Sequence, residues 1–295
     1  MTKSSSLLGR LFKRVLQLSL LMGAAGLAFV WYIGAWNLLF PSSGHDAVAP
    51  VLPEELTAPT VMVFSKTNSF RHKEGIEGGN LALADIAEAS GWGIWFTENG
   101  AVFNSQDLSR FDVVVFQNAT GDMLSATQQQ AFQAWLENGG GWLGIHSAGD
   151  GSHQDWPWYM ENLIGADFTA HIMGPQFQRA TVYLENNEHP ALVRIPDIWD
   201  HDEEWYSWSS SPREKGFKIL ATIDEDSYTP MQKIFGKEVD LSMGDHPVVW
   251  SNCVGSGRSL YAAMGHSKEA FSSSEFRQLL QSSLQWLIKG QGEGC

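Results

Sequence analysis

Five histidines and a short acidic run are the side chains in this sequence that could carry chemistry. Each of these histidines follows, or lies close to, an apolar segment typical of a strand: His72, His146, His171, His201 and His266. Histidine can transfer protons at neutral pH because its ordinary pKa is about 6.5. Loops that follow parallel strands meet at one edge of a sheet, so we expect these side chains to lie close together. The alternative for each one taken singly is a loop histidine that hydrogen-bonds a carbonyl oxygen.

His146 has the most informative surroundings. It ends an apolar run within the stretch Gly139–Gly151, which reads GGGWLGIHSAGDG. Such a segment is typical of a buried central strand of an α/β protein, and residues at the carboxyl end of that strand face the crevice where ligands bind. Gly144 permits a close approach of the backbone. We therefore place His146 at the centre of a predicted active cleft, with a structural histidine as the alternative.

The acidic run is Asp202-Glu203-Glu204, directly before Trp205 and Tyr206. A carboxyl group buried beside aromatic side chains has a raised pKa, as a general acid needs, whereas an ordinary acidic loop is solvated. The chain also has 13 tryptophans, several of them in or beside the predicted cleft loops, Trp156 and Trp205 among them. Indole faces suit the apolar faces of sugar rings, and core packing is the competing interpretation.

Other kinds of site have little support. No two histidines have a compact metal-binding spacing such as H-x-x-x-H with a glutamate between, so a divalent metal stays an open alternative that depends on the predicted convergence. Ser147 follows His146 directly and no G-x-S-x-G motif is present, which disfavours a serine nucleophile. The sequence has neither a G-x-G-x-x-G after its first predicted strand nor a P-loop, so nucleotide binding has no support.

The elements that must position these residues alternate in the first half of the chain. Apolar, β-branched runs predict strands at 60–65, 92–97, 111–117 and in the glycine-led stretch, and helical spacing predicts helices at 74–90 and 125–138. Strands and helices that alternate at these lengths predict a right-handed parallel βαβ sheet. Beyond residue 151 the pattern predicts a short aromatic helix at 155–163, strands at 180–184 and 218–223, a hairpin at 247–264 and a final amphipathic helix at 274–289. The predicted fold is a flavodoxin-like parallel sheet with flanking helices and an antiparallel addition.

An uncharged apolar stretch at 15–40 precedes this domain. It is long enough to cross a hydrocarbon core of roughly 30 Å. Four basic residues come before it, and no acidic residue occurs before Asp46, so the positive-inside rule places the N-terminus in the cytoplasm and the rest outside the plasma membrane. We favour an uncleaved signal anchor, with cleavage near 47–49 as the alternative. The expected divisions are a cytoplasmic segment at 1–14, an anchor at 15–40, a Pro/Ser linker at 41–59, an α/β domain at 60–290 and a tail at 291–295.

Charge excludes one class of partner. Removing the four N-terminal basic residues from the 19 Lys and Arg leaves 15 against 33 Asp and Glu, so the exported part carries about −18. A polyanion such as DNA is repelled by that field, and nucleic acid is therefore not an expected partner. The two cysteines, Cys253 and Cys295, do not form a disulfide framework, although they could pair in an oxidising compartment.

Several short motifs in the same order resemble one known family. They are Phe70-Arg71-His72, the GGGWLGIH run, Glu203-Glu204-Trp205-Tyr206, His246-Pro247-Val248-Val249-Trp250, and Gly257-Arg258 through Gly265-His266. Together, over about residues 59–290, they are similar to the ThuA-like (trehalose-utilisation) family. The resemblance implies a fold like that of class I glutamine amidotransferases and a role around trehalose or related and 3-keto sugars. His146 stands at the turn where those amidotransferases have a cysteine, which disfavours glutamine hydrolysis. Glu203 stands where an aspartate commonly precedes the family's glutamate, which leaves the substrate open.

These observations lead to two hypotheses. The first is an exported, membrane-tethered hydrolase or lyase acting on a small carbohydrate, with a catalytic set formed by His72, His146, His171, Glu204 and His266. In it, His146 is a general base or a metal ligand, and Glu204 is an acid or orients a histidine. The expected substrate-binding residues are Arg71, Trp156, Trp205 and Tyr206. The second hypothesis is a catalytically silent carbohydrate-binding or scaffold domain.

Overall fold

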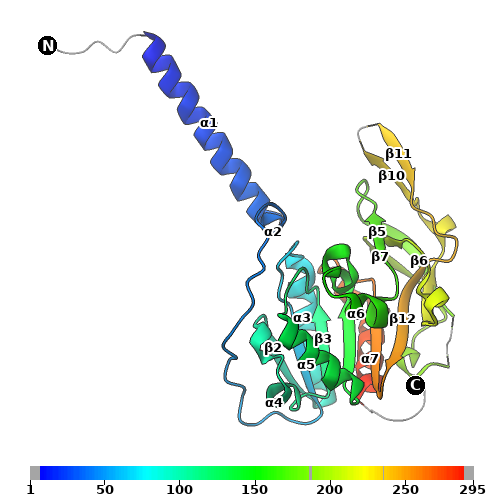
Figure 1. The fold of residues 1–295 in the computed structure, drawn as a ribbon. Coiled ribbons are helices and arrows are strands. Elements are labelled where there is room, and N and C mark those ends of the chain that lie inside the picture. The colour runs from blue at the N-terminus through cyan, green and yellow to red at the C-terminus, as the bar shows by residue number, and fades with distance from the viewer. Residues whose placement is uncertain (1–6, 186–187, 235, 289–295) are drawn as a thin grey trace.

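A nine-stranded sheet forms the centre of the computed structural model, which describes residues 7–185, 188–234 and 236–288 (Figure 1). The strand order is β2-β1-β3-β4-β13-β12-β9-β6-β7. Five strands are parallel: β1 (Thr60–Phe64), β2 (Gly93–Thr97), β3 (Val113–Gln117), β4 (Gly141–Ile145) and β13 (Gly257–Ala262). Four continue the sheet in antiparallel fashion: β12 (Pro247–Val254), β9 (Lys218–Ile223), β6 (Gln178–Leu184) and β7 (Ile198–Glu203). This arrangement confirms the predicted α/β fold with an antiparallel addition.

Helices cover both faces of the parallel half. They are α3 (Lys73–Ser90), α4 (Ser105–Leu108), α5 (Ala126–Glu137), α6 (Pro157–Tyr159) and α7 (Ser274–Ile288). Successive side chains of a strand point to opposite faces. On β3, the ring centroid of Phe116 lies 5.2 Å from that of Phe132 in α5, whereas Gln117 donates to the Gly75 carbonyl in α3 at 2.8 Å. The two helices therefore lie on opposite faces.

The sequence signals for these helix ends are realised in the structure. Ser125 caps α5 in a capping box with Gln128, and Gly91 ends α3 in the left-handed conformation. Five short strands were not predicted as such: β7, the pair β5 (Phe168–His171) and β8 (Tyr206–Trp208), and the hairpin β10 (Met231–Ile234) and β11 (Lys237–Asp240). The acidic run, for which a solvated loop was the alternative interpretation, lies at the end of β7, in which buried and exposed residues alternate.

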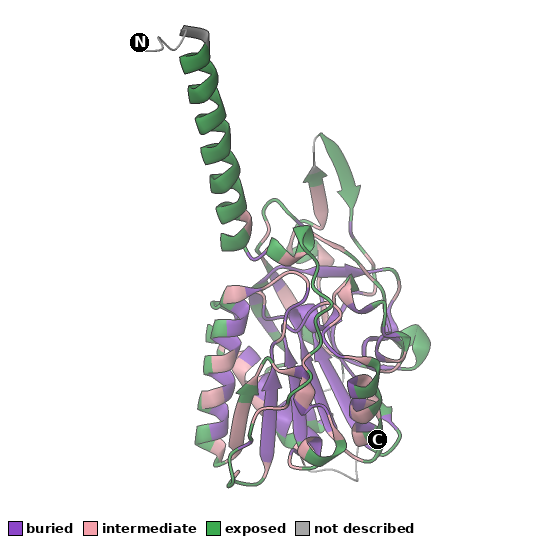
Figure 2. Ribbon diagram, turned by 60° about the vertical axis from the view of Figure 1, so that its left-hand side comes forward, coloured by how far each residue is buried: buried purple, intermediate pink, exposed green. Residues whose placement is uncertain are grey.

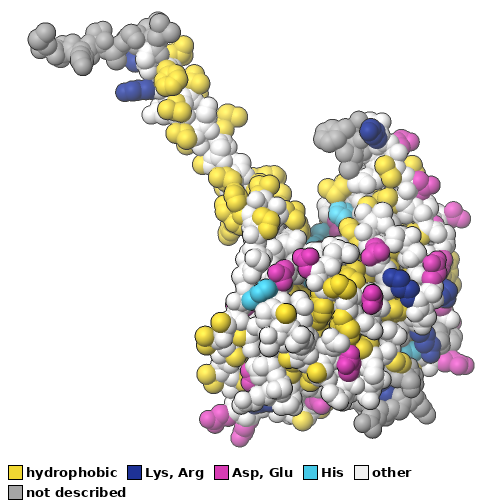
Figure 3. Space-filling view, in the orientation of Figure 1, with side chains coloured by type: hydrophobic (Ala, Val, Ile, Leu, Met, Phe, Trp, Pro, Cys, Tyr) yellow, Lys and Arg dark blue, Asp and Glu magenta, His cyan; other side chains and the backbone are white. Residues whose placement is uncertain are grey.

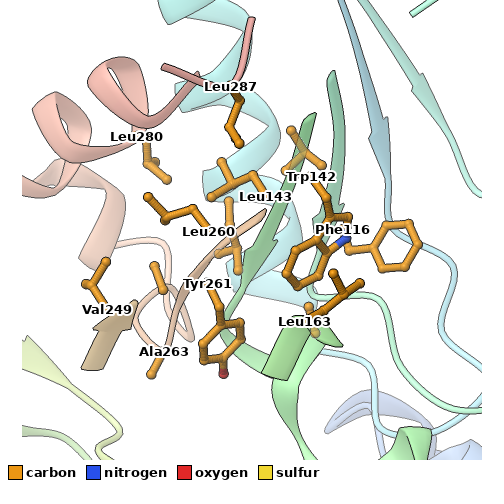
Figure 4. Packing of buried hydrophobic residues seen from close by; sticks show 14 of the residues in the cluster. Phe116, Trp142, Leu143, Leu163, Val249, Leu260, Tyr261, Ala263, Leu280 and Leu287 are labelled. Atoms are coloured by element: carbon orange, nitrogen blue, oxygen red, sulfur yellow. The ribbon is translucent and has the colours of Figure 1, made fainter. Parts of the chain in front are cut away.

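The core packs against both faces of the central strands (Figure 4). Leu143 of β4 and Leu260 of β13 point toward the apolar face of α7. On the other face, Trp142 lies edge-on to Phe116 with 5.9 Å between ring centroids. Burial of a large apolar side chain contributes about 1.5–3 kcal/mol. This packing holds the carboxyl ends of β3, β4 and β13 in fixed positions.

An exposed apolar helix, α1 (Leu7–Tyr32), projects from the domain (Figures 2 and 3). Its stretch Gly9–Tyr32 spans 24 residues with a mean hydropathy of 1.7 and no buried part. These are the length and composition of a membrane anchor or of a signal sequence. The predicted span at 15–40 is displaced, because the helix ends at Tyr32 and Gly34 adopts a φ of 81°. A short helix, α2 (Trp36–Leu39), follows.

Residues 41–59, the predicted Pro/Ser linker, contact the domain. Lys66 pairs with Asp46 at 2.6 Å, Gly93 donates its backbone N–H to the Thr57 carbonyl at 2.7 Å, and Leu52 is buried. The segment lies along the domain because its carbonyl oxygens accept hydrogen bonds from domain residues. The expected tail at 291–295 lies outside the described residues, as do residues 1–6.

Candidate functional site

Four side chains from distant parts of the chain meet at the carboxyl edge of the sheet. His72, His146, His266 and Glu204 each offer a ligand atom, and these atoms lie within 4.8 Å of one another. The first three are buried or nearly so, and Glu204 is 1% exposed. The topology explains the meeting, because His72, His146 and His266 come shortly after β1, β4 and β13, and Glu204 follows β7 directly. His72, His146 and His266 thus meet at the edge where the sequence predicted that they would.

His146 is held in a fixed orientation. It follows β4 with a φ of 51°, an uncommon conformation for a residue with a side chain. Its Nδ1 donates to the Ala263 carbonyl at 2.9 Å, and its own carbonyl accepts from the Tyr261 hydroxyl at 2.6 Å. The first bond fixes the tautomer, so that Nε2 carries the lone pair of the neutral ring. Nε2 lies 3.0 Å from both the Tyr206 hydroxyl and Nδ1 of His266.

Glu204 is the hub of the cluster. Its Oε2 lies 2.8 Å from Nδ1 of His266 and 3.4 Å from Nε2 of His146. Its Oε1 lies 3.0 Å from Nδ1 of His171 and accepts from the Gln176 side chain at 2.5 Å. One buried carboxylate therefore contacts three imidazoles and an amide.

His72 completes the cluster from the start of α3. Its Nδ1 is buried and has no hydrogen-bond partner among the described residues. Its ring centroid lies 4.9 Å from that of His146 and 4.7 Å from that of His266, edge to face in both cases. Gly75 allows the close approach, because a Cβ there would meet the carbonyl oxygen of His266 at 2.5 Å.

Glu203 stabilises the backbone of residues next to the cluster. Its carboxylate accepts from three backbone N–H groups, those of Gly265 at 2.6 Å, Glu204 at 2.9 Å and His266 at 3.3 Å. It is fully buried and lies 3.8 Å from Nε2 of His201. Glu203 thus fixes the backbone of two residues whose side chains belong to the site.

The electrostatics differ from the prediction of a carboxyl with a raised pKa. Burial acts to raise the pKa of Glu204, but its contacts with His146, His171 and His266 outweigh burial and hold that pKa well below the ordinary value. Burial likewise opposes ionisation of Glu203, and the nearby His201 and His146 lower its pKa. Both carboxyl groups are therefore ionised, not protonated general acids, because histidines surround them.

The pKa values of two histidines in the cluster shift in opposite directions. Burial lowers the pKa of His72 well below its ordinary value, and the neighbouring His146 and His266 lower it further. For His146, burial also favours the neutral ring, but Glu204 and Glu203 raise its pKa overall. The neutral ring of His72 and the ionised carboxylate of Glu204 have the protonation states of metal ligands, whereas at His146, whose pKa is raised, a metal would have to displace a proton.

The donor set fits a divalent transition metal. Three imidazole nitrogens and a carboxylate oxygen are ligands that Zn²⁺, Fe²⁺ and related ions accept. The orphaned Nδ1 of His72 indicates a missing partner, because buried polar atoms are normally bonded. The hydrogen bond from Nδ1 of His146 to a carbonyl is typical of an oriented metal ligand.

A cavity of about 530 Å³ opens onto the cluster. His72, His171, Glu204, Tyr206 and His266 contribute to its lining, so four of the five predicted catalytic residues face it directly. His146 lies behind them and is fully buried. The volume is in the range of small-molecule sites.

Three of the four predicted substrate-binding residues lie elsewhere. Trp156 is buried against Tyr159, and Trp205 donates its ring N–H to the Gln178 carbonyl at 2.8 Å. Neither reaches the cavity, so the sugar-stacking interpretation is wrong for both, and core packing explains them. The Arg71 side chain pairs with Glu98 at 2.6 Å and lines a neighbouring cavity of about 310 Å³. Tyr206 does line the site.

His201 also departs from the predicted convergence. It is buried on the core face of β7, where its ring lies 5.5 Å from that of Phe276. Its Nε2 lies 3.8 Å from Oε2 of Glu203, which supports the site.

Several residues that line the cavity were not predicted as site residues: Leu38, Ser69, Phe70, Asp150, Gly151, Ser152, Phe168, Met173 and Gln176. Glu203, which accepts hydrogen bonds from the backbone of Gly265 and His266, was not predicted as a site residue either. Burial raises the pKa of Asp150, which closes the stretch GGGWLGIHSAGDG and so had a signal in the sequence. Of the apolar members, Leu38 and Phe168 lie in the short elements α2 and β5, and Phe70 and Met173 lie in loops.

An α/β domain whose carboxyl edge carries three histidines and a carboxylate defines a protein with a site for proton transfer or metal binding. The chain belongs to the ThuA family, described as trehalose utilisation, whose model matches residues 60–287. No curated protein matches the chain.

Solved structures show the same fold. A ThuA-like protein from Bacteroides uniformis is 24% identical, with a TM-score of 0.68 over 82% of this chain and 96% of its own. A ThuA-like protein from Parabacteroides merdae is 17% identical, with a TM-score of 0.59 over 78% and 89%. A cytoplasmic protein from Salmonella typhimurium LT2 is 11% identical, with a TM-score of 0.52 over 77% and 99%.

Proposed function

We propose that this chain is a membrane-anchored, exported enzyme that processes a sugar of the trehalose or 3-keto-sugar type by acid–base chemistry at a divalent metal. The observation that carries the proposal is the meeting of His72, His146, Glu204 and His266 beside a cavity of about 530 Å³. The family description, trehalose utilisation, supports a sugar as substrate. The reaction class that fits best is hydrolysis or elimination.

The four clustered residues would hold the metal, and their neighbours would handle protons. When bound, a divalent ion supplies a Lewis acid that polarises a substrate oxygen or lowers the pKa of a bound water. His171 suits a general acid or base, because its side chain is 27% exposed in the cavity and its Nδ1 lies 3.0 Å from Oε1 of Glu204. The Tyr206 hydroxyl, 3.0 Å from Nε2 of His146, is placed to bond a substrate oxygen.

The location outside the cytoplasm has its own support. α1 is apolar and exposed, and basic residues precede its apolar part. Cys253 is disulfide-bonded, and disulfides persist in oxidising compartments. A fusion of alkaline phosphatase to the C-terminus should be active in intact bacterial cells. An inactive phosphatase fusion, together with an active β-galactosidase fusion at the same position, contradicts the proposed orientation, because alkaline phosphatase forms its disulfides only outside the cytoplasm.

Turnover by the purified full chain tests the proposed activity. The chain, supplied separately with Zn²⁺, Mn²⁺ and Co²⁺, is screened against trehalose, other disaccharides and their 3-keto derivatives. Glu204→Gln should lower turnover by about 10²–10⁴, whereas His189→Gln, a buried histidine beside Trp286 outside the cavity, should leave it unchanged. If the chain binds a sugar but turns over none of the compounds with any of the three metals, the catalytically silent binding domain is favoured instead.

A further inference from the structure

The apolar helix is fastened to the domain next to the site. Nζ of Lys73 donates to the carbonyls of Trp31 and Tyr32 at 2.7 and 2.8 Å, and it lies 4.3 Å from the centre of the Trp31 ring. The backbone N–H of Arg71 donates to the Gly34 carbonyl at 3.0 Å. A Cβ on Gly34 would collide with the carbonyl oxygen of Arg71, so the chains touch. These contacts join the C-terminal end of α1 directly to the domain.

The residues that follow α1 form part of the wall of the site. Leu38 lines the main cavity together with Glu204 and His266. Ile33 lines the neighbouring cavity, which His72 and His266 also line. The side chain of Asn37 donates to the Thr67 carbonyl at 2.8 Å and holds this segment in place. The site is therefore built partly from the segment that directly follows the apolar helix.

Other apolar side chains are exposed around the same opening. Met173, which lines the main cavity, is 54% exposed, and Phe177 is 43% exposed with its ring 5.1 Å from that of His266. The hairpin β10–β11, with Val239 49% exposed, projects from the same end of the domain as α1 in both ribbon views (Figures 1 and 2). That end thus presents apolar groups beside a polar, buried cluster.

We infer that the ligand of this cleft is a membrane-borne amphiphile, whose sugar-like head group enters the cavity while its apolar chain stays in the bilayer. The inference rests on the proposed function and narrows its substrate class. Trp31 and Tyr32 lie at the end of α1, where aromatic residues mark the membrane–water interface. Because the next few residues line the cavity, its mouth lies at the membrane surface. Leu38, Phe70, Phe168 and Met173 offer apolar contacts for the part of the ligand nearest the chain.

The position of the mouth can be measured without any ligand. The full chain is placed in phosphatidylcholine vesicles that contain a lipid with a nitroxide on its head group. A fluorescent label is attached to Met173→Cys and, as the control, to Ile198→Cys, which is similarly exposed at 56%. Ile198 opens β7, five residues from Glu203 and so roughly 16 Å from the site end of the strand. The label at Met173 should be quenched strongly and the label at Ile198 weakly; equal quenching contradicts the inference.

The ligand class is tested with two compounds that share a head group. Dodecyl maltoside and maltose are titrated into the vesicles, and the label at Met173 reports binding. The label should respond to dodecyl maltoside at a concentration at least about tenfold lower than the concentration of maltose that gives the same response, because the dodecyl chain adds apolar contact. Leu38→Asp should remove that difference. Dodecylphosphocholine, with the same chain and another head group, controls for partition into the lipid and should give no saturable response.

The outcomes separate this inference from the proposed function. If the label at Met173 responds to dodecyl maltoside and to maltose at equal concentrations, or responds to neither compound, the inference of a membrane-borne ligand is wrong. The metal content of Leu38→Asp should equal that of the parent chain, because Leu38 offers no ligand atom. A parent chain that binds no metal would overturn the proposed function even where quenching places the mouth at the membrane.

Discussion

Nδ1 of His266 lies 2.8 Å from Oε2 of Glu204, although 62 positions separate the two residues in the chain. β7 lies four places from β13 in the order of the sheet. Glu204 directly follows β7, and His266 comes shortly after β13. The contact therefore requires the antiparallel half of the sheet to curl back toward the parallel half. The hydrogen bonds from Gly265 and His266 to Glu203 hold this closure. The site exists because two halves of one sheet meet.

Loss of the Gln176 amide should weaken metal binding without abolishing it. The Gln176 side chain donates to Oε1 of Glu204 at 2.5 Å and so orients the carboxylate. Outer partners of ligands typically contribute 10–100-fold in metal affinity, so Gln176→Ala should raise the dissociation constant by about that factor. Gln133→Ala, which removes an amide bonded to Glu137 on α5, is the matched control. Equal affinities in both variants would show that Gln176 does not orient Glu204.

Replacement of His171 should separate catalysis from metal binding. His171 contacts Glu204 but stands outside the group of four that could hold an ion. His171→Ala should therefore keep its metal while kcat falls by about 10²-fold or more, as expected for a lost general acid or base. The measurements are elemental analysis and steady-state kinetics on the same preparation. A variant with full activity would remove His171 from the mechanism.

Glu203 should be the most important charged residue for stability. Its buried carboxylate satisfies three backbone N–H groups, and its removal leaves them unpaired in the interior. Breaking such a buried network costs about 3–5 kcal/mol, so Glu203→Ala should lower the free energy of unfolding by that amount. Asp202→Ala, one residue earlier on the exposed face, should change it by less than about 0.5 kcal/mol. Urea unfolding in mild detergent checks both, and similar losses would count against the role of Glu203.

Acid should destabilise the contact between Glu225 and His246. Nδ1 of His246 lies 2.8 Å from Oε1 of Glu225, and this bond lowers the pKa of Glu225 to about 2. The folded-state pKa lies below the unfolded value near 4.5, so the contribution is complete above pH 4.5 and is lost as the pH falls toward 2. Glu225→Gln should flatten the stability profile in that window. An unchanged profile would mean that Glu225 does not contribute there.

The parallel half of the fold could be predicted because its signals are local. The apolar run at Thr60–Phe64 indicates a strand. Ser125 marks the start of one helix, and Gly91 marks the end of another. His146 could be placed in the site for a similar reason, since a buried strand that ends at a polar turn faces the crevice.

The antiparallel half was harder because its signals are mixed. In β7, Trp199, His201 and Glu203 face inward with period two, but two of the three are polar, so the pattern did not predict a strand. The burial of Glu203 depends on the backbone N–H groups of Gly265 and His266, which the curled sheet brings beside it. The predicted substrate-binding role of Trp205 was wrong for a related reason. Composition cannot distinguish an indole that faces a ligand from one that packs in the core.

The metal content of the purified full chain tests the central claim most directly. After exposure to Zn²⁺, Mn²⁺ or Co²⁺ and removal of free ions, elemental analysis should find about one ion per chain for at least one metal. His146→Ala should lose most of it, because its Nε2 points into the cluster, whereas His189→Gln should retain it. A parent chain without bound metal under all three conditions, or a His146→Ala variant that binds as well as the parent, would contradict the account.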